Sequence, residues 1–525
     1  MSKIVLLAIN AKYVHSSLAV WSLAASIKKR HGAKHDVNVI EANINQNIAD
    51  IAYSVTELEP DFVGISAYIW NAGILPELLK LLREQLPGVV IVLGGPEAVY
   101  NAQHWRDNGA DFVLKGQNDQ SVDPYTDEYF SALGDKLAYI ETSRGCPYSC
   151  AFCLSADSSV EFFPLETVKE RILKLSQTKT KTIKFVDRTF NCNPKRAYEL
   201  YEYIIGLQSC KARLCTNCKF HFEVAADLFD DKTLNLLATA PPGKIQFEIG
   251  LQSFFEPALK ASSRKTDLIK AEKNITKLLK TQNIHIHVDL IAGLPYETLD
   301  SFRESFDRAY RLGAHTLQLG FLKLLHGSKL RNEAQKLGII YDKNPPYEIQ
   351  SSTWLSALDI KILKNTENAL QHTYNKNRFL KTIEYVLEVS GISPFKFYQT
   401  LGSKHPNYAM QLEDYVYHVY EFCKDLTGVD NEILCDKLHY DWLSMVKGKN
   451  LPAFLKNRKG RLNALRLTPC AICPVQCKSK VKTASCPPVH TLKRNEHAIL
   501  STGERIIVDT GSQNPVTGLY KVLIN

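Results

Sequence analysis

Three closely spaced cysteines, Cys146, Cys150 and Cys153, form the pattern in this sequence with the most specific chemistry. They make a C-x3-C-x2-C run after a strand-like segment at 137–143. Three thiolates in one loop can hold three irons of a four-iron cluster, which leaves the fourth iron open to a small molecule. Gly145 allows the chain to turn tightly beside such a cluster. Buried core cysteines and a partial zinc site are the alternatives, but zinc sites more often use paired C-x2-C units.

The run, with the aromatic Phe152 before its last cysteine, resembles the signature of the radical S-adenosylmethionine (SAM) enzymes. The resemblance implies a [4Fe-4S] cluster whose open iron chelates the amino and carboxylate groups of SAM. It implies that SAM is cleaved to a 5′-deoxyadenosyl radical, with electrons from a reductase, a flavodoxin or a ferredoxin. It makes Cys146, Cys150 and Cys153 both the cluster ligands and the catalytic residues.

The region from 137 to 335 alternates strand-like and helical segments and should position these cysteines. It contains six βα-type units, fewer than the eight of a closed TIM barrel. It resembles the partial (β/α)6 barrel of radical SAM cores, so functional groups should lie at the carboxyl ends of the strands. The expected strands are 137–143, 182–186, 219–225, 244–251, 284–291 and 316–321. The expected helices are 165–177, 194–206, 230–239, 267–282 and 299–312.

Several strand ends of this region fit the radical SAM family residue by residue. The resemblance implies that Glu223 accepts hydrogen bonds from the SAM ribose and that the turn from Asp289 to Thr298 lies along the adenine. The alternatives are that Glu223 is a solvated or salt-bridged strand residue and that the turn at Gly293 is an ordinary turn. Asp187-Arg188 either contacts the amino or carboxylate end of SAM or forms a structural ion pair. The residues expected to bind SAM are Glu223, Gln252, Ser253, Asp289, Gly293, Pro295 and Phe152.

The first 116 residues predict a doubly wound α/β domain with a parallel sheet, because near-continuous apolar strands alternate with helices. The expected strands are 4–9, 37–41, 62–67, 89–93 and 112–114, and the expected helices are 18–30, 48–58, 74–85 and 99–108. Ligands bind at the carboxyl ends of such strands. We therefore expect the loops 10–17, 66–68 and 94–97 to converge on one ligand.

An α/β domain before a radical SAM core resembles the cobalamin-binding domain of the B12-dependent branch. The resemblance implies cobalamin as a cofactor, held by residues of the three loops: Asn10, His15, Ser66, Tyr68, Gly94 and Gly95. Around His15 the sequence departs from D-x-H-x-x-G, with Tyr13 for Asp and Leu18 for Gly. We therefore expect His15 to enter a helix or contact a phosphate and not to ligate cobalt. A domain that binds nothing is the alternative.

Length and composition fit an ordinary globular protein of about three domains. The chain has 525 residues, 45% hydrophobic and 23% charged, and a net charge of +9. No apolar run approaches the ~20 residues of a membrane span, and no signal peptide is evident. Thirteen cysteines in clusters favour metal ligation in a reducing cytoplasm over disulfides. The expected parts are a domain at 1–116, a linker at 117–136, the radical SAM core at 137–335, a helical domain at 336–445 and a basic Cys-rich module at 446–525.

The last module carries a second cysteine pattern. Cys470, Cys473, Cys477 and Cys486 predict a metal site, either a second iron–sulfur cluster or structural zinc, and metal analysis of a fragment from about residue 442 would separate the two. Between 442 and 495 there is no Asp or Glu. Cys210, Cys215 and Cys218 have a less diagnostic spacing, and we expect no site there.

These features and the resemblance to B12-dependent radical SAM enzymes predict a cobalamin-dependent radical SAM enzyme that acts as a methyltransferase. By resemblance, one SAM methylates cobalamin, a second yields the 5′-deoxyadenosyl radical, and the substrate radical takes a methyl group from methylcobalamin at an unactivated carbon. Rearrangement or cyclisation without methyl transfer is one alternative. An RNA-modifying protein that uses the basic tail is another, supported only by the acid-free stretch. The substrate, a small molecule or a peptide, is not specified, and no membrane partner is expected.

Overall fold

The computed structural model describes residues 1–525 except 117–120, 208–217, 405–409, 447–449, 457–496 and 525. The chain forms two compact units. The first comprises Met1–Ala314 and Leu319–Ile360, and the second comprises His315–Gln318 and Lys361–Asn525. Within the described residues, no helix is long and apolar enough to cross a membrane.

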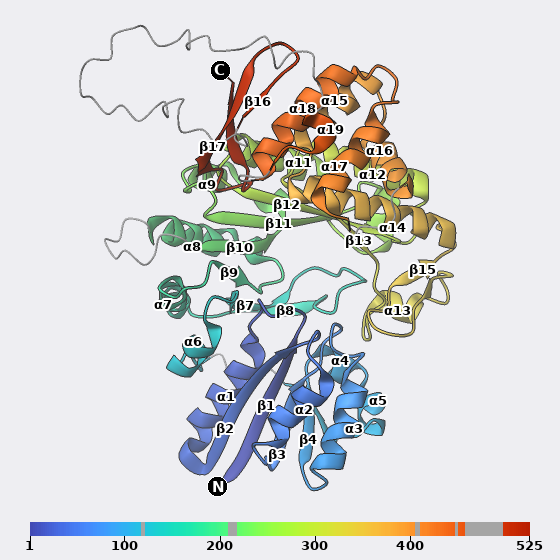
Figure 1. The fold of residues 1–525 in the computed structure, drawn as a ribbon. Helices are drawn as coiled ribbons and strands as arrows, with labels where there is room; N and C mark the ends of the chain where they lie inside the picture. Colours follow the sequence, from blue (N-terminus) through green and yellow to red (C-terminus); the bar gives the residue numbers. More distant parts are fainter. Residues whose placement is uncertain (117–120, 208–217, 405–409, 447–449, 457–496, 525) are drawn as a thin grey trace, which may run out of the picture. The chain divides into compact units, whose positions relative to one another are not determined.

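The N-terminal domain is built on a five-stranded sheet in the order β2-β1-β3-β4-β5 (Figure 1). All four strand pairs are parallel, as the apolar runs predicted. The order reverses between β1 and β3, and ligands of doubly wound sheets bind at such a point. The strands are β1 (Ser2–Asn10), β2 (His35–Asn43), β3 (Phe62–Ser66), β4 (Val90–Gly94) and β5 (Phe112–Leu114). The helices are α1 (Leu18–His31), α2 (Ile48–Thr56), α3 (Leu75–Gln85), α4 (Pro96–Tyr100) and α5 (Ala102–Asp107).

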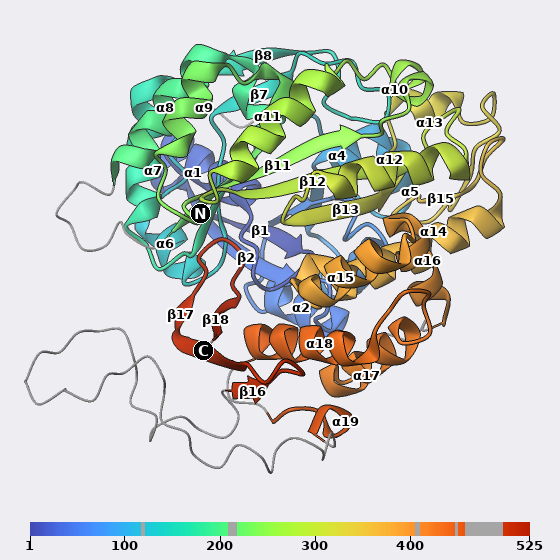
Figure 2. The same cartoon turned by 90° about the horizontal axis from the view of Figure 1, so that it is seen from above.

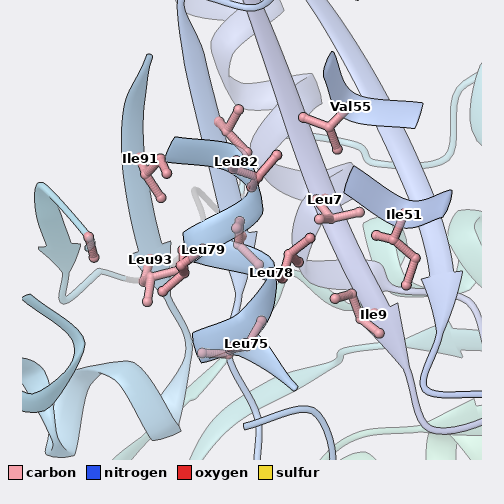
Figure 3. Close-up of a cluster of buried hydrophobic side chains, with 14 of the residues drawn as sticks. Leu7, Ile9, Ile51, Val55, Leu75, Leu78, Leu79, Leu82, Ile91 and Leu93 are labelled. Atoms are coloured by element: carbon pink, nitrogen blue, oxygen red, sulfur yellow. The ribbon is translucent and has the colours of Figure 1, made fainter. Parts of the chain in front are cut away.

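Figure 3 shows the hydrophobic core on one face of this sheet. Leucines spaced by three or four residues on α3 point toward the strands, which is the spacing of one helical face. The labelled members are Leu7, Ile9, Ile51, Val55, Leu75, Leu78, Leu79, Leu82, Ile91 and Leu93. This packing holds the strand ends, and therefore the loops that follow them, in fixed positions.

The segment expected to be a linker contains a helix, α6 (Asp127–Leu133). Thr126 caps it, because its side chain accepts a hydrogen bond from the Tyr129 backbone N–H. The Tyr129 ring is fully buried and lies edge-on to Trp21 of α1, at 5.8 Å between centroids. Because the segment is mostly polar, the buried contact between Tyr129 and Trp21 was not predicted from the sequence.

The radical SAM region contains a six-stranded sheet in the order β13-β12-β11-β10-β9-β6. The register is parallel for β6–β9, β9–β10, β10–β11 and β11–β12, as expected for a partial barrel. The strands are β6 (Ala138–Ile140), β9 (Thr182–Phe185), β10 (Lys219–Val224), β11 (Ile245–Gln252), β12 (His285–Ala292) and β13 (Thr316–Phe321). The helices, some of which lie outside β11 and β12 in Figure 2, are α7 (Leu165–Ser176), α8 (Pro194–Gly206), α9 (Asp231–Ala238), α10 (Glu256–Ala261), α11 (Leu268–Lys280) and α12 (Leu299–Arg311).

The strands β11 and β12 alternate between fully buried and half-buried side chains. The buried face of β11 packs against helices; the Phe247 ring, for example, lies 5.7 Å from the Tyr201 ring of α8. Because side chains alternate along a strand, the other face carries Glu248 and, on β12, His287 and Asp289. The inner face of this sheet is therefore polar.

The first unit ends in a short segment, with α13 (Lys329–Glu333) and the antiparallel pair β14 (Ile340–Tyr341) and β15 (Ile349–Ser351). The second unit is mainly helical, as predicted, and a three-stranded antiparallel sheet packs on α18 through Leu443, Ala498, Ile506 and Val508. Its elements are α14 (Ala357–His372, which begins in the first unit), α15 (Leu380–Ser390), α16 (Pro394–Lys404), α17 (Leu412–Cys423), α18 (Asn431–Met445), α19 (Ala453–Lys456), β16 (His497–Ile499), β17 (Arg505–Gln513) and β18 (Tyr520–Ile524).

Candidate functional site

The cysteine loop begins on a hairpin at the end of the first barrel strand. Cys146 is the last residue of β7 (Ser143–Cys146), which pairs with β8 (Ser158–Phe162). Gly145 has φ +90°, and a Cβ there would lie 2.1 Å from the Ser159 carbonyl oxygen. Only glycine fits this close approach. The tight turn expected beside the cluster is therefore present.

The rest of the loop is held by backbone bonds to two distant segments. The Ala151 N–H donates to the Ser262 carbonyl, at 2.9 Å, and the Leu330 N–H donates to the Ala151 carbonyl, also at 2.9 Å. The Cys146 N–H donates to Ser158 Oγ at 2.9 Å. Since the loop is anchored at both ends and in the middle, its thiols are held in place before any cluster is added.

Each of the three sulfurs has a polar neighbour. Arg264 Nη1 lies 3.6 Å from Cys150 Sγ, the Ser155 N–H lies 3.4 Å from Cys153 Sγ, and Thr189 Oγ1 lies 3.8 Å from Cys146 Sγ. The Arg264 guanidinium and the Ser155 N–H are donors that stabilise sulfur with negative charge, and hydrogen bonds to the sulfurs tune an iron–sulfur cluster. The Thr189 hydroxyl already donates to the Arg188 carbonyl at 2.9 Å. Burial raises the pKa of the Cys153 thiol, so the isolated loop favours the thiol and a metal would have to displace the proton.

The thiols fit a cluster better than a single ion. In the described part of the chain, no three Cys, His, Asp or Glu side chains are close enough to hold one metal ion. In a four-iron cluster each thiolate binds a different iron, so the sulfurs do not need to converge on one point. Cys146, Cys150 and Cys153 are all free of disulfides, and the first two are buried.

Asp187, after β9, has a structural role in this geometry. It is buried and accepts hydrogen bonds from Thr142 N, at 3.1 Å, from Thr142 Oγ1, at 2.7 Å, and from Ser143 Oγ, at 2.5 Å. Burial raises its pKa to about 6. Asp187 thus fixes the residues that lead into the cysteine hairpin, which favours the structural alternative for this position, although its partners are hydroxyl and amide groups and not a cation.

The inner face of the barrel carries a network of ionisable groups around Glu223. Glu248 Oε2 lies 2.8 Å from His221 Nε2 and 3.2 Å from Lys184 Nζ, and His287 Nε2 lies 3.0 Å from Asp289 Oδ1. Burial would raise the pKa of Glu248, but His221 and Lys184 lower it to about 2. Burial and the charge of Glu248 raise the pKa of Glu223 to about 7. Glu223 is therefore a carboxyl of this network that changes charge near neutral pH.

We expect SAM affinity to rise as the pH increases through about 7, by about 10-fold, if Glu223 accepts hydrogen bonds from the ribose. The carboxylate accepts from both hydroxyls, whereas the protonated acid loses one acceptor. Equilibrium dialysis of SAM against anaerobically reconstituted protein would measure the rise. The Glu223→Gln variant should lack it, and an identical pH profile in that variant would assign the titration to another group.

Gln252 lies at the carboxyl end of β11 in an unusual conformation. Its φ is +71°, and its side chain folds back over Gly250, where a Cβ would lie 2.1 Å from Gln252 Nε2. Its buried Oε1 has no hydrogen-bond partner in the described chain. A strained residue with an unpaired buried oxygen is typical of a ligand site. Arg264 Nη2 donates to the Gly250 carbonyl at 2.8 Å, so the cysteine loop and this strand end share one arginine.

Ser253 lies in a different environment from Gln252. It is fully buried and donates to Glu297 Oε1, which also accepts from Ser305 Oγ at 3.4 Å. Burial raises the pKa of Glu297 to about 8. This cluster fixes the turn at Gly293, whose φ is +98°. The Ser253 hydroxyl is thus committed to that turn, and contact with SAM stays a prediction for Ser253, Gly293 and Pro295 alike.

The three loops of the N-terminal domain converge, as the sequence predicted. The Trp70 indole N–H donates to the Ile9 carbonyl at 2.9 Å, and Asn71 Nδ2 bonds the Ile9 carbonyl at 3.1 Å and the Ser66 carbonyl at 2.9 Å. The Ala67 N–H donates to the Gly94 carbonyl at 2.7 Å. The Asn71 side chain therefore connects the loops that follow β1 and β3. This role was not predicted from the sequence, because a single asparagine in a loop belongs to no recognisable motif.

Two features of these loops fit a large planar ligand. Gly95 has φ +96°, and a Cβ there would meet the Ala67 carbonyl oxygen at 2.6 Å, so two backbones approach closely. The rings of Tyr68 and Trp70 stack at 4.4 Å with 6° between their planes, and Trp70 is 42% exposed. Trp70, stacked on the half-buried Tyr68 beside a glycine-lined edge, offers a flat surface. That Ser66, Tyr68, Gly94 and Gly95 hold cobalamin stays a prediction.

His15 and Asn10 contact the chain itself. His15 Nδ1 lies 2.6 Å from the Tyr139 hydroxyl of β6, and Asn10 Nδ2 donates to the His15 carbonyl at 3.1 Å. The Leu137 N–H donates to the Val14 carbonyl at 2.8 Å, so this loop lies along the edge of the barrel sheet. Burial lowers the pKa of His15.

We expect His15→Ala to leave the cobalt EPR spectrum of the cobalamin-loaded protein unchanged. The Nδ1 atom is already used by Tyr139, and the sequence around His15 lacks the Asp and Gly of the His-on pattern. The comparison requires the wild type and the variant at equal cobalamin content. Loss of imidazole nitrogen hyperfine coupling in the variant would show that His15 ligates cobalt.

The remaining cysteine predictions fall mainly outside the described residues. Cys470, Cys473, Cys477 and Cys486, with most of the acid-free basic stretch around them, lie in 457–496. Cys210 and Cys215 lie in 208–217, and Cys218 is buried at the start of β10. A second metal and a nucleic-acid surface in the tail therefore stay predictions.

Comparison with known families supplies independent evidence. Residues 4–123 match the model of the B12 binding domain, and residues 140–309 match that of the radical SAM superfamily. The chain therefore contains a B12 binding domain followed by a radical SAM domain. Residues 335–467 match a third model, a protein family of unknown function named DUF4080. These matches support cobalamin, SAM and a [4Fe-4S] cluster as its cofactors.

Two curated relatives extend this comparison. The 2-(S-pantetheinyl)-carbapenam-3-carboxylate methyltransferase of Streptantibioticus cattleyicolor is 22% identical over 51% of this chain and 47% of its own. The anaerobic magnesium-protoporphyrin IX monomethyl ester cyclase of Cereibacter sphaeroides is 21% identical over 50% of this chain and 51% of its own. The chain spans about half the length of these curated relatives.

A solved structure shares the fold. The methyltransferase TsrM from Kitasatospora setae, with cobalamin and a [4Fe-4S] cluster bound, superposes with a TM-score of 0.54 at 15% identity, covering 68% of this chain and 83% of TsrM. The predicted order of a B12 domain followed by a partial radical SAM barrel is thus confirmed.

Proposed function

We propose that this chain transfers a methyl group from SAM to an unactivated carbon of its substrate, with cobalamin as the intermediate carrier. The observation that carries the proposal is the presence of two sites in one compact unit: the anchored three-cysteine loop and the three convergent loops of the N-terminal domain. The methyltransferase names among the relatives support it. A reductant must supply electrons, for which we propose a flavodoxin or a ferredoxin.

Different residues of the chain would have different roles in this reaction. Cys146, Cys150 and Cys153 would hold the cluster, and Arg264 and the Ser155 N–H would stabilise its negative charge. When bound, the cluster and SAM supply a radical that abstracts hydrogen, and cobalamin supplies the methyl group. The protein would orient these groups and exclude water, so that the radical reacts with the substrate and not with solvent.

SAM would be oriented by groups at the barrel strand ends. Glu223 would accept hydrogen bonds from the ribose, Gln252 Oε1 would gain the partner that it lacks, and Asp289 with the Gly293 turn would lie along the adenine. Gly94 and Gly95 would let cobalamin approach the backbone of the N-terminal sheet. The ionisable inner face offers hydrogen bonds to a polar substrate beside these sites.

Product analysis of turnover tests this proposal. Methyl transfer by this route consumes two SAM molecules, so S-adenosylhomocysteine and 5′-deoxyadenosine should form in a ratio of about one. With SAM labelled on its methyl carbon, the label should enter the cobalamin pool and then the product. Productive turnover that forms 5′-deoxyadenosine without S-adenosylhomocysteine would contradict methyl transfer.

That contradicting result would favour a second function, cyclisation or rearrangement. The similarity to the magnesium-protoporphyrin ester cyclase is the observation that supports it, since that relative covers the same share of this chain as the methyltransferase does. Label would then stay on SAM-derived methionine, whereas in methyl transfer it leaves SAM.

A further inference from the structure

The segment from Tyr347 to Trp354 lies at the start of the region that matches the family of unknown function. It runs antiparallel to the chain that leaves β13. The Leu324 N–H donates to the Tyr347 carbonyl at 2.9 Å, and the Ile349 N–H donates to the Leu322 carbonyl at 3.0 Å. The Leu322 N–H in turn donates to the Ala292 carbonyl at 2.9 Å, one residue before Gly293. The segment is therefore an added strand beside the predicted SAM turn.

One end of the segment contacts the N-terminal domain. The Tyr347 hydroxyl donates to Glu97 Oε1 at 2.5 Å. Both residues are buried, with 4% of Tyr347 and 5% of Glu97 exposed. Glu97 directly follows Gly94-Gly95-Pro96, and its N–H donates to the Ala67 carbonyl at 3.3 Å. A buried hydrogen bond to a carboxylate is strong and directional, so Tyr347 fixes the loop predicted to bind cobalamin.

The other end contacts the turn predicted to lie along the adenine. A Cβ on Gly293 would meet Ile349 Cδ1 at 2.8 Å, so Ile349 packs directly against that glycine. The Trp354 ring lies 4.6 Å from the Tyr296 ring, with 43° between their planes. Trp354 is half-buried and Tyr296 is 50% exposed. The pair thus lies at the surface of the turn.

One residue at each of these two contacts, Tyr347 of the segment and Tyr296 of the turn, has an unusual backbone conformation. Tyr347 has φ +58° and Tyr296 has φ +69°, a region that residues other than glycine rarely adopt. Such conformations persist where the surrounding contacts hold them, and they are concentrated at functional sites. Arg331 helps to hold the first: its guanidinium lies 4.8 Å from the centre of the Tyr347 ring.

We propose that the segment Tyr347–Trp354 is a positioning element that couples the two cofactor sites. It ties the Gly94–Glu97 loop to the Gly293–Tyr296 turn, so the arrangement that favours one cofactor favours the other. This proposal rests on the proposed function, because it takes those two loops as the cobalamin and SAM sites. It gives part of the family of unknown function a role in the reaction geometry.

The test measures binding and does not require the substrate. SAM dissociation constants are measured anaerobically on the reconstituted full chain with and without hydroxocobalamin, and cobalamin dissociation constants with and without SAM. In the wild type, each cofactor should tighten the other by about 5-fold or more, and by the same factor in both directions. Tyr347→Phe should weaken cobalamin about 10-fold, because Glu97 loses its partner, and should bring the coupling factor close to one.

Two further variants make the result specific. Tyr341→Phe changes a tyrosine of the neighbouring strand that also faces Arg331, at 5.1 Å, and should keep wild-type affinities and coupling. Trp354→Leu, at the half-buried end, should weaken SAM binding and also reduce the coupling, and it provides the test if Tyr347→Phe does not fold. Wild-type coupling in both Tyr347→Phe and Trp354→Leu overturns the proposal. A wild-type protein that binds no cobalamin overturns the proposed function as well, and is recognised before any variant is made.

Discussion

Replacing Cys146, Cys150 and Cys153 together by alanine should abolish 5′-deoxyadenosine formation and remove about four irons per chain. The three thiols lie in one anchored loop, and each has its own polar neighbour. With the ligands gone, no cluster can bind and reduce SAM at this site. Iron and sulfide analysis after anaerobic reconstitution, with quantification of 5′-deoxyadenosine, measures both effects.

Cys423→Ala is the matched control for that variant. Cys423 is a buried cysteine on helix α17, outside the loop, and its loss should reduce stability without affecting iron or SAM cleavage. The difference between the triple variant and the wild type also separates this cluster from any metal bound by the tail. Wild-type 5′-deoxyadenosine from the triple variant would disprove the cluster assignment.

Gly145→Ala should have the second largest effect, although it changes no ligand. A Cβ at this position would lie 2.1 Å from the Ser159 carbonyl oxygen, on a backbone with φ +90°. The hairpin must open to accept it, which we expect to cost about 2–4 kcal/mol and to displace Cys146 from its place in the loop. Urea unfolding and iron content after reconstitution measure the two consequences.

Gly313→Ala is the control that distinguishes the effect of an unfavourable backbone φ from the effect of a steric clash. Gly313 has φ +73° but has no atom within 4 Å of the position of a Cβ. The substitution should cost only about 1 kcal/mol, from the unfavourable φ, and leave the cluster intact. If Gly145→Ala reconstitutes as much iron as Gly313→Ala, the hairpin does not position the cluster ligand.

The parallel sheets, and the ends of the sheets at which ligands are expected to bind, could be predicted from the sequence. Strands such as β1 and β4 are apolar runs followed by helices, and the convergence of the loops after them follows from the rule for doubly wound sheets. The cysteine loop was predictable because its spacing is local. In each case the signal lies within one short stretch of chain.

Residues that act across long separations could not be predicted. Arg264 reaches Cys150 from 114 positions away, and Tyr347 reaches Glu97 from 250 positions away. Neither residue belongs to a motif, and the distance between them and their partners is set only when the sheets pack. Ser253 is a further case: its position at a strand end predicted a contact with SAM, but packing of the Gly293 turn buries its hydroxyl against Glu297.

The most direct test of the central claim is a half-reaction with methyl-labelled SAM on the reduced, cobalamin-loaded protein. It requires no knowledge of the substrate, because only transfer of the methyl group from SAM is followed. Methyl transfer through cobalamin predicts about one label in the cobalamin pool and about one S-adenosylhomocysteine for each bound cobalamin. SAM that is consumed only to 5′-deoxyadenosine and labelled methionine, with an unlabelled cobalamin pool, would contradict it.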